Sequence, residues 1–163
     1  MEGMDNQMEI NKLGIDETIE LYKSDIYLLL KYIPWFESQN EKHEMTYYKE
    51  KRDGVESIPV PVYSGTLLAF VNEAKRTNLI DINYRFVYSK YRINNYEDEW
   101  KLIESSDVLQ MNILIAILSK YILQGMTKGL VWTEGVQHQI YYRVLLKMKE
   151  MIEFHEGESL GIG

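Results

Sequence analysis

Basic and aromatic residues alternate in one short stretch, which is the strongest candidate for a binding surface. From Tyr84 to Asn95 there is no acidic residue, although the whole chain is acidic. Aromatic side chains that alternate with basic ones can bind single-stranded nucleic acid, an acidic protein surface or a phosphorylated small molecule. Alternatively, the rings are half buried and the cations only keep that face solvated. The candidate binding residues are Tyr84, Arg85, Phe86, Tyr88, Lys90 and Arg92.

Carboxylates and histidines elsewhere in the chain form no recognisable catalytic or metal-binding motif. Glu134 and His138 are four residues apart and could share a metal on a helix, but a zinc site needs three or four ligands. Adjacent carboxylates at Glu97, Asp98 and Glu99 could suggest acid–base chemistry. Their position at the start of a predicted helix explains them through the helix dipole. We therefore expect no catalytic residue, metal or cofactor.

The composition is that of an acidic chain of one-domain size. Its 163 residues include 25 acidic and 18 basic side chains, which gives a formal net charge of −7, and there is no cysteine. Negative charge disfavours general nucleic-acid binding. The lack of cysteine excludes disulfides, thiolate nucleophiles and Cys-ligated zinc, and it fits a reducing compartment.

The stretch from Asp107 to Leu123 is the element that the other segments must surround. Apolar residues fall on every side of its helical projection and include an unbroken run over 113–118. Such a helix is usually buried on all sides, so we predict a central helix over 107–124. It is shorter than the about 20 apolar residues of a membrane span, and no apolar signal segment opens the chain. We therefore expect a cytoplasmic protein with no membrane contact.

The remaining segments predict a mainly helical domain with a little β-structure. Amphipathic spacing indicates helices over about 16–33, 65–78, 95–103 and 134–152. Asp53-Gly54 is typical of a hairpin turn, and the period-two alternation of residues 82–88 favours a short strand or an extended loop. The predicted fold is mainly α with a small β-hairpin (α+β). One compact domain over 15–154 lies between flexible tails at 1–14 and 155–163.

Several short pieces between residues 28 and 151 carry a resemblance to a known family. They are Ile33-Pro34-Trp35-Phe36, Pro61-Val62-Tyr63-Ser64 with Leu68 and Phe70, Trp100, Ser106-Asp107, Leu118-Ser119 and residues 144–149. In order and spacing they resemble a bacterial and phage-borne family, domain of unknown function 6508. Where that family has a signature of Glu, Arg and Phe after the central helix, this chain has residues 124–128 instead. The resemblance implies a compact helical domain with a host-directed binding role, and it implies no known activity.

Three classes of function remain open. The leading interpretation is a small acidic protein that binds a protein partner, with a phage-derived, host-directed inhibitor as one form of it. The second is a small-molecule binder or enzyme with an aromatic pocket, for which the candidate residues are Trp35, Tyr63, Trp100 and Trp132. The third is a nucleic-acid binder through Tyr84 to Arg92, which the net charge disfavours. The oligomeric state is not predicted.

Overall fold

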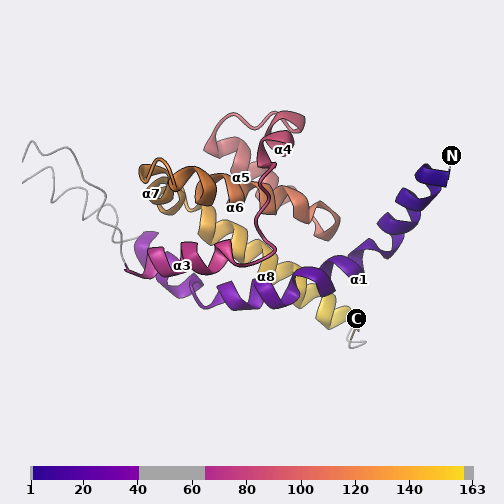
Figure 1. The fold of residues 1–163 in the computed structure, drawn as a ribbon. Coiled ribbons are helices and arrows are strands. Elements are labelled where there is room, and N and C mark those ends of the chain that lie inside the picture. Colours follow the sequence, from indigo (N-terminus) through magenta and orange to yellow (C-terminus); the bar gives the residue numbers. More distant parts are fainter. Residues whose placement is uncertain (1, 41–64, 160–163) are drawn as a thin grey trace, which may run out of the picture.

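The computed structural model describes residues 2–40 and 65–159, and all regular structure in these ranges is helical (Figure 1). In chain order the elements are α1 (Glu2–Leu30), α3 (Gly65–Lys75), α4 (Tyr84–Lys90), α5 (Tyr96–Ser105), the 3-10 helix η1 (Val108–Gln110), α6 (Met111–Gly125), α7 (Leu130–Gln137) and α8 (Ile140–Ser159). Residues 33–40 are helical as well. The hairpin predicted around Asp53-Gly54 lies outside the described residues.

Helix α6 is the centre of the fold, which confirms the prediction of a buried central helix. All its residues from Ile113 to Leu118 are buried, and helices α4, α5, α7 and α8 pack against it. By length and composition alone, residues 108–125 are also the one helix in the described ranges that could cross a membrane. The surrounding helices bury most of that segment, as expected for the core helix of a soluble protein.

Helices α1 and α8 lie against each other along one side of this core (Figure 1). The residues of α8 predicted to face inward are all buried: Ile140, Tyr141, Val144, Leu145, Met148 and Ile152. The bounds of both helices differ from the sequence prediction. The helix predicted over 134–152 is divided, with residues 134–137 in α7 and residues 140–152 in α8, because Gln139 has a positive φ of 58° that interrupts the helix. Helix α1 begins at Glu2 rather than near Asp16, because no proline interrupts it and Met, Glu and Gln favour helices. Helix α8 continues to Ser159, beyond the predicted domain end at residue 154.

The predicted α+β class is wrong for the part of the chain that the structure describes. Residues 82–88, predicted as a strand or loop, lead into and form helix α4. A strand would have placed Tyr84, Phe86 and Tyr88 on one face. The helix instead turns Tyr84 and Val87 inward and leaves Phe86 exposed. Tyr84, Val87 and Tyr88 follow the i, i+3, i+4 spacing of a helix, while Tyr84, Phe86 and Tyr88 follow the two-residue alternation of a strand. The sequence therefore fits both conformations, and packing against α6 selects the helix.

Candidate functional site

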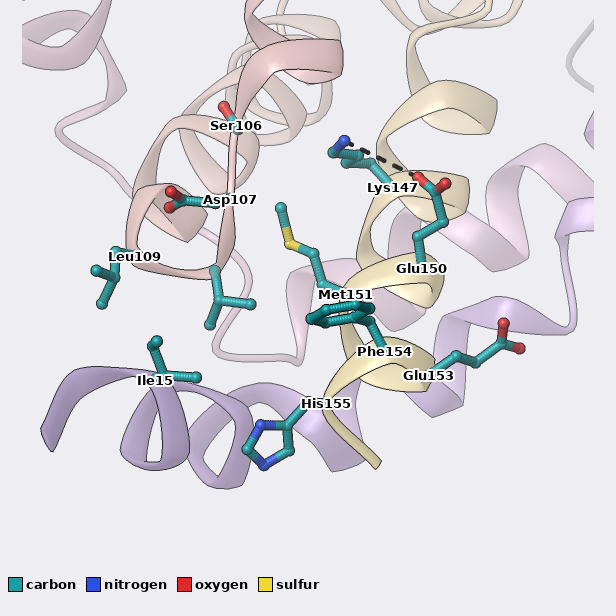
Figure 2. A pocket seen from close by; sticks show the side chains of 11 residues that line it. Ile15, Ser106, Asp107, Leu109, Lys147, Glu150, Met151, Glu153, Phe154 and His155 are labelled. Carbon is teal, nitrogen blue, oxygen red and sulfur yellow. Dashed lines mark ion pairs between the residues drawn. The ribbon is translucent and has the colours of Figure 1, made fainter. Parts of the chain in front are cut away.

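An open groove lies where α1, η1 and the last turns of α8 meet (Figure 2). We call it the α1–η1–α8 groove. Its volume is about 700 Å³, within the range of ligand-binding sites. Its apolar lining is formed by Ile15, Val108, Leu109, Met151 and Phe154. Phe154 is 70% exposed and Leu109 is 49% exposed, so large apolar side chains stay in contact with water.

The turn between α5 and α6 places η1 at the edge of this groove. Ser106 ends α5 with an extended backbone, and its hydroxyl donates to the carbonyl of Leu102 at 2.6 Å. The backbone N–H of Asp107 then donates to the side-chain oxygen of Gln110, which fixes the turn into η1. Gly14 lets η1 approach α1, because a Cβ at that position would lie 3.1 Å from Leu109 Cδ2.

The rim of the groove is negatively charged. Its carboxylates are those of Asp107, Glu150 and Glu153, and Lys147 is the one lysine among the lining residues. His155, which also lines the groove, has its Nε2 3.3 Å from Asp16 Oδ1. Lys147 Nζ lies 3.9 Å from Glu150 Oε2 (dashed line in Figure 2), and Lys149 Nζ lies 3.9 Å from Glu153 Oε1, so two of the three carboxylates are partly balanced. The groove can therefore accept apolar side chains that are accompanied by positive charge.

Helix α4 divides the predicted binding stretch into a buried half and an exposed half. Tyr84 and Tyr88 face the core, and Gln124 on α6 donates to the Tyr84 hydroxyl at 3.2 Å. These two rings are therefore structural. The other predicted residues point to solvent together with Ile82, and we call this set the α4 face: Ile82, Arg85, Phe86, Lys90 and Arg92.

The α4 face combines exposed apolar area with unbalanced positive charge. Ile82 is 78% exposed and Phe86 is 71% exposed. Within the described residues, Arg85, Lys90 and Arg92 form no ion pair. The sequence pattern identified the cations and Phe86 but not Ile82. Ile82 lies in the turn before α4, so no helical spacing in the sequence marks it.

The inner half of α4 is held by a buried carboxylate, that of Glu99 on α5. The hydroxyls of Tyr88 and Tyr121 both donate to it, with oxygen–oxygen distances of 2.5 Å. Lys120 Nζ is 3.4 Å from Glu99 Oε2 and lies over both tyrosine rings. The helix-dipole explanation is therefore insufficient for Glu99, whose side chain is fully buried and ties α4, α5 and α6 together. None of these four residues lines the α1–η1–α8 groove.

This network predicts a loss of stability at alkaline pH. Burial, and then the charge of Glu99, raise the pKa of the Tyr88 and Tyr121 hydroxyls far above their ordinary value of 10.0. The folded protein keeps these protons at a pH at which the unfolded chain releases them. Their stabilisation is therefore complete below pH 10 and declines as the pH rises above it. We expect urea melts to show a falling free energy of unfolding above about pH 10. The decline should be shallower in the Tyr88→Phe, Tyr121→Phe double variant, and an equal decline in both proteins would contradict this assignment.

The described aromatic residues that were predicted to line a pocket each have a packing or hydrogen-bond partner of their own. Trp35 packs edge-on against the ring of Phe36, with centroids 5.2 Å apart. Trp132, on α7, lies against α6 and donates from its indole N–H to the Ile122 carbonyl at 2.8 Å. Tyr63 lies outside the described residues. The lining of the α1–η1–α8 groove contains no Tyr or Trp.

Trp100 and the suggested metal pair are explained by packing around α5. The Trp100 indole N–H donates to the His138 carbonyl at 2.7 Å, and the Arg143 guanidinium lies 4.1 Å from the Trp100 ring centroid. The His138 ring stacks on Tyr96 at 4.3 Å. In the described ranges no group of three or more His, Asp or Glu side chains is placed to hold a metal ion.

Comparisons with known proteins identify no relative of this chain. No protein-family model, curated protein or solved structure matches the chain. The resemblance to domain of unknown function 6508 therefore stays a prediction.

Proposed function

We propose that this chain is a small cytoplasmic binding protein whose α1–η1–α8 groove takes an apolar, positively charged helical segment of a protein. The observation that carries the proposal is the exposure of Phe154 and Leu109 inside an acidic rim. Helix-in-groove recognition uses this combination, with apolar anchors on one helix face and charges at its edges. Aromatic side chains at the centre of such a contact usually supply much of its binding energy.

The geometry of the groove favours a protein segment over the other two classes of ligand. Small-molecule sites are usually concave, with a few polar groups converging on the ligand, whereas the polar groups here stand on the rim. Phosphates would be repelled by Asp107, Glu150 and Glu153, which argues against nucleic acid. If the resemblance to the phage-borne family holds, the partner is a host protein.

The test is binding of a designed probe to the full chain. The probe is a fluorescein-labelled helical peptide with leucine at i, i+4, i+7 and i+11 and lysine at the flanking positions. We expect fluorescence anisotropy to show binding to the wild-type protein. Phe154→Ala should weaken the affinity by about 10-fold or more, as loss of an aromatic hot spot does. The matched control is Phe86→Ala, which removes an equally exposed ring from α4 and should bind no less tightly than wild type.

A second peptide with glutamate in place of each lysine tests the acidic rim. It should bind more weakly than the lysine peptide, because it brings like charges to Glu150 and Glu153. Equal affinity for the two peptides would contradict the proposal that the acidic rim selects a positively charged segment. Unchanged affinity of Phe154→Ala would show that the groove is not the binding site.

A further inference from the structure

The α4 face has the chemistry that the groove is proposed to accept. Phe86 on α4 and Ile82 in the turn before it are both exposed, so both are available to contact an apolar groove. Arg85, Lys90 and Arg92 surround them and form no ion pair within the described ranges. A ridge formed by α4 and the turn before it, with two apolar anchors and three exposed cations, is thus available on the same molecule.

The charges of the two surfaces are complementary. The groove rim has three carboxylates, of which Glu150 and Glu153 lie 3.9 Å from Lys147 and Lys149, while no acidic residue stands between Tyr84 and Asn95. Two copies with a net charge of −7 each repel one another at long range. At contact, however, the interacting groups lie within about one Debye length, 8 Å at physiological salt, where the local opposite charges decide the interaction.

One molecule cannot bring its own two surfaces together. In Figure 1, α4 lies at the top of the molecule, while the C-terminal end of α8, which lines the groove, lies at the bottom. The ridge of one copy can therefore reach only the groove of another. Such a contact joins two different surfaces and leaves one free ridge and one free groove on every pair.

We propose that the α4 face of one copy docks in the α1–η1–α8 groove of a second copy, so that chains associate head to tail. The inference rests on the proposed function of the groove, and it names a second copy of this chain as a ligand. Because the contact is heterologous, it continues beyond the dimer, into a ring if the rotation closes and into an open filament if it does not.

Sedimentation velocity on the full chain tests the proposal with two complementary variants. Wild type should show a sedimentation coefficient that rises with concentration. Phe86→Asp removes the ridge and Phe154→Asp removes the groove, so each variant alone should sediment as a monomer. An equimolar mixture should form a one-to-one dimer and nothing larger, because only one intact ridge and one intact groove remain per pair.

Control variants separate loss of contact from loss of folding. Thermal melts should match wild type for both variants, since both rings are exposed. If either variant melts early, Ile82→Asp replaces the ridge variant and Leu109→Asp replaces the groove variant, and the same mixing result is expected.

Three results would overturn head-to-tail association. The first is a wild-type protein that stays monomeric at about 0.5 mM, a concentration at which a contact with micromolar Kd is nearly saturated. The second is association of either single variant on its own. The third is an equimolar mixture of the two variants that forms no dimer. If the lysine peptide still binds a monomeric wild type through Phe154, the proposed function stands and only the second copy is excluded. Another combination of results would point to a different partner for the α4 face. If the wild type is monomeric and binds a glutamate-rich peptide, and Phe86→Asp abolishes that binding, the α4 face binds an acidic foreign partner instead.

Discussion

Replacing Glu99 by alanine is expected to lower the free energy of unfolding by about 3–5 kcal/mol, the range found when one partner of a buried charged network is removed. The substitution leaves two tyrosine hydroxyls, of Tyr88 and Tyr121, without their acceptor. Each buried donor left without a partner costs about 1–3 kcal/mol. It also removes the carboxylate beside Lys120 and leaves a cavity. Urea denaturation at neutral pH measures the loss.

Two controls show whether the network or the helix position is responsible. Glu99→Gln keeps one acceptor oxygen and should lose less than the alanine variant. Glu97→Ala changes an exposed carboxylate in the same first turn of α5, and it should stay within about 0.5 kcal/mol of wild type, as surface changes do. A loss below about 1 kcal/mol for Glu99→Ala, the size of one ordinary hydrogen bond, would show that the network is not needed for the fold.

The second large effect is expected from shortening core side chains of α6. Leu118 is fully buried and Ile115 is almost so, in the helix that most of the others pack against. Leu118→Ala and Ile115→Ala should each destabilise by about 2–5 kcal/mol, since the cavity adds to the lost burial. Denaturant melts measure the two losses in the free energy of unfolding, and we expect the m-value to stay unchanged.

Leu130→Ala is the matched control for these variants. Leu130 is at the start of α7 and is exposed, so its loss should be below about 0.5 kcal/mol. Losses of that small size at both Ile115 and Leu118 would mean that α6 is not the core of the protein in solution.

The central helix, α5 and α8 could be predicted because their signals are local. An unbroken apolar run has only one favourable place, the interior. Asn95 caps α5, with its side chain accepting from the Asp98 N–H at 2.8 Å. The inward stripe of α8 repeats at helical spacing over three turns.

Helix α4 was missed because a segment of seven residues fits two periods at once. Tyr84, Phe86 and Tyr88 alternate as a strand would, and only the contact with α6 turns Phe86 outward. The strand prediction grouped Tyr84 and Tyr88 with the exposed cations as binding residues. In the helix both tyrosines instead face the core. Propensity and pattern are weak guides when tertiary packing chooses between conformations.

The groove could not be found from the sequence, because its lining comes from three distant segments. Ile15, Leu109 and Phe154 are each unremarkable apolar residues in a pattern of helical spacing. Only the packing of α1 against α8 and η1 brings them together with water on one side. The burial of Glu99 was hidden in the same way, since its neighbours Glu97 and Asp98 share its type and place on the chain.

The most direct test of the groove assignment is a titration of the ¹⁵N-labelled, full-length Phe86→Asp variant, which keeps the groove and lacks the competing ridge, with the lysine-flanked leucine peptide, followed by amide chemical shifts. We expect the largest changes at the amides of Ile15, Leu109 and Phe154, with those of α4 staying near their starting positions. Changes that concentrate on α4, or an absence of saturable changes at the groove, would contradict the proposal that this groove binds an apolar, positively charged helix.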